Sequence, residues 1–119
     1  MPALNFKKQF APLVATGQKK QTIRAMRKRP FRANDVLFLY TGMRTKNCAK
    51  ILDTVCKSVE DITIDPKNGQ IKLGDNYLSD NEIIELAKAD GFDCVEDFYS
   101  FFEKNNTEIF VGQLIKWEN

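Results

Sequence analysis

The chain has 119 residues, a length that suits one domain able to bury roughly two thirds of the surface its unfolded form exposes. With 43% hydrophobic and 29% charged residues, the composition excludes a disordered or fibrous protein. We find neither a signal peptide in MPALNFKKQF nor an apolar run near the roughly 20 residues of a membrane helix, so we expect a cytoplasmic protein with no membrane partner.

Three cysteines are present, Cys48, Cys56 and Cys94, without a CxxC pair and without any histidine. We therefore predict no metal site and no other cofactor, and we interpret all three cysteines as buried free thiols.

The charge is divided unevenly along the chain. Residues 1–50 hold twelve Lys or Arg and one acid, for a net charge of +11, whereas residues 51–119 hold six bases and fifteen acids, for −9. One interpretation is that the two halves neutralise each other across a folded interface. However, residues 19–32 hold seven bases and no acid, which favours a surface that meets a polyanion such as RNA.

The first half of the chain predicts short elements. We expect a strand over 3–6, a short helix within 8–15 that Pro12 interrupts and Gly17 caps, and an extended segment over 21–24. A basic loop follows over 25–34. Residues 35–40 (DVLFLY) are apolar on both faces, which predicts a central strand.

The second half alternates strands and helices. We expect a long strand over 49–59 and a bulge at 60–61. Residues 62–64 continue this strand or form a neighbouring one, and they pair in a hairpin with 70–73. Ser79 and Glu82 have the spacing of a capping box, which predicts a helix ending at Gly91. A helix with core aromatics follows over 94–102, and a closing strand over 109–117, with Gly112 marking a bend or a close approach. These elements predict an α+β fold, a small and mostly antiparallel β-barrel with helices packed on it.

One short pattern carries the candidate chemistry. Gly17, Lys19, Thr22 and Arg24 read G-x-K-x-x-T-x-R between a helix end and a strand. Because alternate residues of a strand share a face, Thr22 and Arg24 point the same way, and Lys19 can fold toward them. An amine, a hydroxyl and a guanidinium together suit a phosphate or the edge of a base.

This pattern, followed by DVLFLYTGMRTK, the tetrad ADGF at 89–92, an aromatic helix and the closing GQLIKW, resembles the ASCH domain family over nearly the whole chain. ASCH domains are similar in fold to PUA domains, so the resemblance implies a PUA-like barrel and an RNA or nucleotide-like partner. It also implies a cleft lined by Lys19, Thr22 and Arg24.

The same resemblance implies two enzymatic alternatives. One branch of the family removes the acetyl group of N4-acetylcytidine, using the Lys and Thr of the motif with a Glu, at the position where this chain has Asp90. Thr22 would attack the acyl carbonyl, and neutral Lys19, its pKa lowered by Lys20 and Arg24, would accept the proton. Other members are described as ribonucleases, for which Asp90, Asp93 and Glu96 or Asp97 would be metal ligands.

The candidate site is thus composed of three groups. The catalytic candidates are Lys19, Thr22 and Asp90. An alternative interpretation of Asp90 is a C-terminal helix residue that precedes a capping glycine and has no role in chemistry. The ligand-binding candidates are Gly17, Lys20, Arg24, Tyr40 and Arg44, of which Tyr40 is a stacking surface or a core side chain. The outer RNA-binding rim comprises Arg27, Lys28, Arg29 and Arg32. A regulatory contact with an acidic protein is a further alternative for the basic surface.

Overall fold

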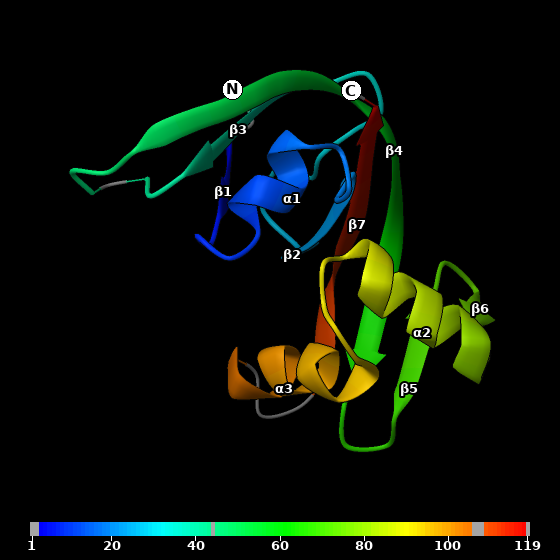
Figure 1. The fold of residues 1–119 in the computed structure, drawn as a ribbon. Helices are drawn as coiled ribbons and strands as arrows, with labels where there is room; N and C mark the ends of the chain where they lie inside the picture. Colours follow the sequence, from blue (N-terminus) through cyan, green and yellow to red (C-terminus); the bar gives the residue numbers. More distant parts are fainter. Residues whose placement is uncertain (1–2, 44, 106–108, 119) are drawn as a thin grey trace.

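The computed structural model describes residues 3–43, 45–105 and 109–118. Within them, seven strands form one sheet and three helices lie on it (Figure 1). Along the chain the elements are β1 (Ala3–Phe6), α1 (Ala11–Ala15), β2 (Gln21–Ala25), β3 (Val36–Thr41), β4 (Ala49–Asp65), β5 (Gln70–Leu73), β6 (Asn76–Tyr77), α2 (Asp80–Ala89), α3 (Val95–Asn105) and β7 (Phe110–Glu118).

The long strand β4 organises the sheet. Its first part pairs with β3, its second part pairs with β7, and its end also forms the β4–β5 hairpin, with Ile62 opposite Leu73 and Ile64 opposite Ile71. β2 pairs with β7, and β1 pairs with β3. The β1–β3 pair is parallel, and the other pairs among the described strands are antiparallel. The pairing of the described strands does not return to its start, so this mixed α and β fold has an open sheet and the expected barrel is not confirmed.

The predicted bulge of β4 at 60–61 is wrong, whereas 62–64 do continue the strand. The strand runs without a break from Ala49 to Asp65, and Glu60 and Asp61 pair in regular register with Leu114 and Gln113. Both acids simply point to solvent, so their polarity did not require a bulge. One irregularity lies between Cys56 and Ser58, where Lys57 is the extra residue opposite β7. A second lies opposite Leu39 and Tyr40 of β3, where Ile51 is the extra residue.

Local sequence signals placed most elements correctly. Ser79 accepts a hydrogen bond from the Glu82 N–H, and the Glu82 side chain accepts one from the Ser79 N–H, which confirms the capping box. Gly17 and Gly91 follow the ends of α1 and α2 with φ of 82° and 95°, the left-handed region that glycine adopts most easily. None of the helices in the described residues is long and apolar enough to cross a membrane.

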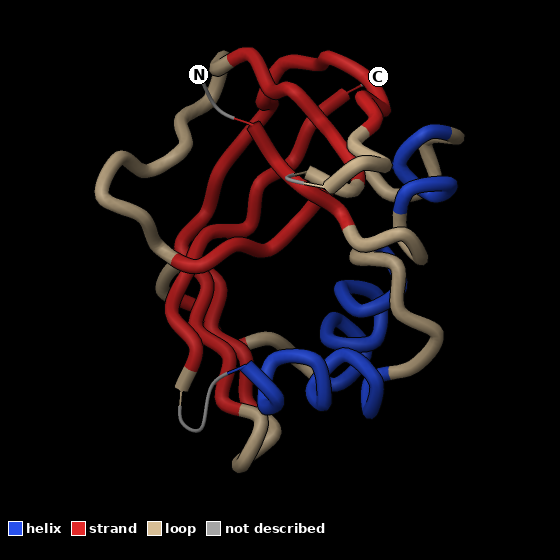
Figure 2. Tube along the Cα trace, turned by 90° about the vertical axis from the view of Figure 1, so that its left-hand side faces the viewer, coloured by secondary structure: helices blue, strands red, loops and turns tan. Residues whose placement is uncertain are grey.

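Two apolar cores meet in the middle of the molecule. One lies around α1, β1 and β3 and contains Leu39 and Trp117, while the other lies where α2 and α3 pack on the second half of β4 and contains Ile64 and Phe98. Phe92, on the segment between α2 and α3, packs against both. In Figure 2 the helices gather on one side of the strands, with α2 and α3 over the lower part of the sheet.

Burial differs from expectation at a few positions. β3 lies between β1 and β4 as predicted, yet it is not buried on both faces, because Val36 is 48% exposed while Leu37 and Leu39 are buried. Of the three cysteines, only Cys56 is buried. Cys48 and Cys94 are exposed because one precedes β4 at a hairpin turn and the other precedes α3, where neither core covers them.

Gly112 is required by close packing between β7 and β2. A Cβ at this position would lie 2.1 Å from the carbonyl oxygen of Arg24. We therefore expect Gly112→Ala to lower the free energy of unfolding by about 3 kcal/mol in urea denaturation, because the two strands must separate to admit it. Gly69→Ala is the control, since its Cβ meets nothing within 4 Å and only the positive φ of 65° opposes it. Equal losses in the two variants would contradict the packing argument.

Candidate functional site

A pocket of about 300 Å³ lies where the two cores meet. Its polar lining comes from β1 and the residue after it, from β2 and the turn before it, and from the C-cap of α2. Its aromatic lining comes from both cores. The lining residues are Asn5, Phe6, Lys7, Phe10, Lys19, Thr22, Ile23, Arg24, Ala25, Asp90, Phe92, Phe101, Phe102 and Phe110. The structure therefore brings together Lys19, Thr22, Arg24 and Asp90, which the sequence analysis had grouped.

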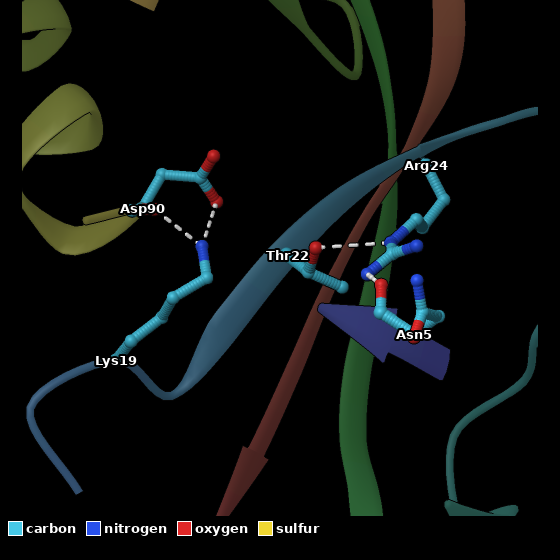
Figure 3. Close-up of polar contacts among 5 residues, drawn as sticks. All are labelled: Asn5, Lys19, Thr22, Arg24 and Asp90. Atoms are coloured by element: carbon cyan, nitrogen blue, oxygen red, sulfur yellow. Dashed lines mark hydrogen bonds and ion pairs between the residues drawn. The ribbon is translucent and has the colours of Figure 1, made fainter. Parts of the chain in front are cut away.

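A buried ion pair between Lys19 and Asp90 lines this pocket. The two side chains lie 71 residues apart in sequence, and Lys19 Nζ is 3.1 Å from Asp90 Oδ1. The same ammonium donates a hydrogen bond to the backbone carbonyl of Asp90 (Figure 3). Lys19 and Asp90 are 3% and 4% exposed, so the pair is almost fully removed from water.

Backbone contacts hold both members of the pair in place. The Lys19 N–H donates to the Leu13 carbonyl, which fixes the turn between α1 and β2. Asp90 is the C-cap residue of α2, and its N–H donates to the Leu86 carbonyl. The next residue, Gly91, lies against the Phe10 ring so closely that a Cβ there would be 2.9 Å from it. Asp90 therefore ends its helix and also faces the pocket, so both interpretations of this residue apply.

Burial shifts both members of the pair toward their neutral forms. The loss of water raises the pKa of Asp90 to about 6, although the charges of Lys19 and Arg24 oppose the shift. Burial likewise lowers the pKa of Lys19, which the charge and hydrogen bond of Asp90 oppose and the charge of Arg24 slightly assists. The sequence predicts a lowering by Lys20 and Arg24, of which only Arg24 contributes. Desolvation is the main cause instead, and the Lys20 side chain lies in a different depression.

A second group of polar contacts surrounds Arg24. Its Nε donates to Thr22 Oγ1 at 3.1 Å, and its Nη2 donates to the Asn5 carbonyl at 2.7 Å (Figure 3). The guanidinium also lies 4.9 Å from the centre of the Phe6 ring. Thr22 and Arg24 thus share one face of β2, as alternation predicted, and the hydrogen bonds of Arg24 go to a hydroxyl and a carbonyl rather than to a carboxylate.

Aromatic rings form the apolar wall of the pocket, and the sequence analysis did not assign them to the site. Phe92 contacts Phe10 edge to face at 5.3 Å and Phe101 at 5.5 Å between ring centres. The ammonium of Lys7 lies 4.7 Å from the centre of the Phe101 ring, and that of Lys19 lies 5.0 Å from the Phe10 ring. Phe101 was expected in the core but is only half-buried. Its place at the pocket depends on tertiary packing that helical spacing does not reveal.

The other predicted ligand-binding residues that the structure describes, Gly17, Lys20 and Tyr40, do not line this pocket. Gly17 forms the turn after α1, and Lys20 lines a depression of its own with Gln21 and Trp117. Tyr40 is half-buried on β3, and the centre of its ring is 5.9 Å from the Lys50 ammonium. It is not among the described residues that line the pocket. Arg44 lies outside the described residues.

The predicted basic rim forms a second depression, of about 550 Å³, immediately after β2. It is lined by Arg27, Lys28, Arg29, Pro30, Phe31, Arg32 and Asp35. Phe31 anchors this loop in the core, and its N–H and carbonyl form a reciprocal pair of hydrogen bonds with the Gln113 amide at 3.0 and 3.1 Å. Arg27 stacks over the Phe31 ring at 4.5 Å. The loop therefore has a defined shape although its cations are exposed.

No three His, Cys, Asp or Glu side chains of the described residues come together to hold a metal ion. Of the four carboxylates considered for a nuclease, Asp90 is paired with Lys19, and Asp93, Glu96 and Asp97 are exposed.

A scan against protein-family models and searches of curated proteins and of solved structures found no significant match to this chain. The resemblance to ASCH domains therefore stays a prediction. The chemistry of the pocket and of the basic loop is the basis on which function is inferred.

The Lys19–Asp90 pair can be measured by a double-mutant cycle. We expect Lys19→Met and Asp90→Asn each to lower the free energy of unfolding by roughly 3 kcal/mol, because each leaves a buried charge without its partner. The loss in the double variant should be smaller than the sum of the two single losses, and the difference, which is the coupling energy, should be about 2 kcal/mol. Urea denaturation at pH 7.5 provides the measurement.

The chain offers a matched control for this cycle. Lys50 and Asp53 form an ion pair with the same 3.1 Å separation, but their side chains are 46% and 49% exposed. Their coupling should stay below about 0.5 kcal/mol, because water screens an exposed pair. Purely additive losses at Lys19 and Asp90 would show that burial does not couple them.

Proposed function

We propose that this protein binds single-stranded RNA, with one base or nucleoside in the pocket and neighbouring phosphates on the basic loop. The observation that carries the proposal is the buried Lys19–Asp90 pair on the floor of a pocket with an aromatic wall. A planar base needs a flat apolar surface and a few fixed donors and acceptors at its edge. In the pocket, the Phe92 and Phe101 rings provide the apolar surface. Lys19, Thr22 and Asp90 provide the donors and acceptors.

The volume and the surroundings of the pocket support a ligand of this size. About 300 Å³ is at the lower end of ligand pockets, which suits a single base with its sugar better than a longer segment. Ala25 lines the pocket and Arg27 lines the basic depression, so the two surfaces are two residues apart in the chain. A strand of RNA with a base in the pocket therefore has cations within reach of its next phosphates.

The loop cations supply the part of the affinity that depends on salt. We expect binding of a short single-stranded RNA to weaken with salt at a log–log slope of about −0.7 for each phosphate contacted. The double variant Lys28→Glu, Arg29→Glu should bind roughly tenfold more weakly at low salt, with a slope shallower by about 1.4. Fluorescence anisotropy across a salt series measures both quantities.

Two further variants test whether RNA binding depends on the loop and the pocket rather than on the overall charge. The double variant Lys67→Glu, Lys72→Glu changes the net charge by the same amount, but on the β4–β5 hairpin at the lower end of Figure 1. Its affinity for RNA should stay within about twofold of the wild-type affinity. Thr22→Val removes a pocket hydroxyl and should weaken binding without altering the slope. Equal effects of the two charge reversals, or a response without salt dependence, would refute RNA binding through this loop.

A second candidate function is amide hydrolysis on an N4-acylated cytidine, which the lowered pKa of Lys19 beside Thr22 favours. Neutral Lys19 would take the Thr22 proton as Oγ1 bonds to the acyl carbon. The carbon–nitrogen bond then breaks, the amine leaves with the proton from Lys19, and water hydrolyses the acyl-threonine. In the structure Lys19 contacts Asp90 and Thr22 contacts Arg24, so substrate has to redirect Lys19 toward Thr22.

Neighbouring lysines provide the test of this second candidate. Incubation with N4-acetylcytidine should release cytidine and acetate, detected by mass spectrometry. Lys19→Ala should reduce the rate by at least about 10³, because the proton acceptor is lost. Lys20→Ala should keep it, since that side chain lies outside the pocket. Equal turnover by wild type and Lys19→Ala, or none by wild type, would exclude the reaction.

A further inference from the structure

The charges that line the pocket between the two cores do not balance. The lining contains three cationic side chains, Lys7, Lys19 and Arg24, and one acidic side chain, Asp90, for a net charge of +2. Asp90 forms its ion pair with Lys19. Among the residues that the structure describes, no carboxylate forms an ion pair with Lys7 or with Arg24. The pocket therefore presents more positive charge than the chain itself neutralises.

Arg24 has hydrogen-bond donors that its neighbours do not use. A guanidinium has five N–H groups. One contacts Thr22 Oγ1 and another contacts the Asn5 carbonyl, so three have no partner in the described part of the chain (Figure 3). Burial lowers the pKa of Arg24, and the charge that opposes this shift is that of Asp90, which is already paired with Lys19. Two neutral acceptors thus orient the guanidinium and leave most of its donors to a ligand.

Lys7 lies on the exposed edge of the same pocket. It follows β1, its side chain is exposed, and its ammonium lies 4.7 Å from the centre of the Phe101 ring. A ring face attracts a cation, but it does not accept several N–H bonds as an oxyanion does. Arg24 is bonded to Asn5, only two residues before Lys7. A flexible lysine at the edge and an oriented guanidinium further inside can therefore contact one anion together.

We propose that the nucleotide in the pocket carries a terminal phosphate, which Lys7 and Arg24 bind. This inference rests on the function proposed above and specifies its ligand. A terminal phosphate carries a charge of about −1.5 to −2 at pH 7, which matches the excess of the lining, whereas a phosphate within an RNA chain carries a single charge. Arginine binds phosphate through two parallel N–H bonds, for which Arg24 has donors. The phosphate belongs to the end of an RNA or to a free mononucleotide.

Competition against a fluorescent reference RNA measures what the terminal phosphate contributes. Three unlabelled RNAs of one sequence carry a 5′-phosphate, a 3′-phosphate or neither. One phosphorylated form should bind about tenfold more tightly than the unphosphorylated RNA, the usual gain from a charge-assisted hydrogen bond. An unphosphorylated RNA longer by two nucleotides has about the same added charge, and its affinity should rise by less than about twofold.

Calorimetry with the four nucleoside monophosphates and their nucleosides distinguishes the two sources of the phosphate. Tighter binding of the phosphorylated RNA than of any mononucleotide assigns an RNA end, and the opposite order assigns a free mononucleotide. RNA that binds without preference for a terminal phosphate would overturn this inference and leave the proposed RNA binding intact. A mononucleotide that binds when RNA does not would refute only the RNA binding, and no binding of either would refute both.

Two adjacent lysines provide a matched pair of variants. Lys7→Ala should reduce the tenfold preference for the phosphorylated RNA to below about threefold, because one of its two cations is lost. Lys8→Ala should keep the preference, since Lys8 is exposed and is not among the described residues that line the pocket. Each preference compares two RNAs on one variant, so a loss of stability lowers both affinities and leaves their ratio. Equal preferences in the two variants would refute the assignment of the phosphate to Lys7.

Discussion

The buried ion pair between Lys19 and Asp90 is the constraint on which the candidate site depends. Removing two charges from water costs much of what their attraction returns, so the pair is weak evidence for stability and stronger evidence for a defined local geometry. It fixes the end of α2 against the turn before β2 and so joins the two apolar cores at one point. The pocket exists because the cores meet there without closing completely over the pair.

β2 separates two kinds of chemistry. On one face Lys19 is balanced by a carboxylate and surrounded by aromatic rings, which suits a flat base of little charge. On the other face Lys20, Lys57 and Lys116 line a separate depression with Gln21 and Trp117. The basic loop after β2 is a third surface, held by the Gln113 amide, that presents cations to solvent.

Sequence reasoning succeeded where a signal is local and failed where tertiary contact decides. The capping box at Ser79, the β4–β5 hairpin and the close approach at Gly112 each depend on neighbouring residues or on a glycine. Lys19 and Lys20 are adjacent and chemically identical, yet only Lys19 is buried, because the carboxylate that receives it lies on α2. The aromatic wall and the open sheet could not be predicted for the same reason, since ring contacts and strand pairing join distant segments.

The pairing of β2 with β7 also has a consequence for the order in which the protein is made. Thr22 and Arg24 lie opposite Ile115 and Gln113, so the strand that carries the pocket hydroxyl and guanidinium pairs with a strand that is synthesised much later. Asp90 likewise emerges long after Lys19. While the chain is still growing on the ribosome, the basic N-terminal half is exposed without its acidic counterpart, and the pocket has neither its floor nor its neighbouring strand. The pocket therefore cannot form until β7 has been synthesised.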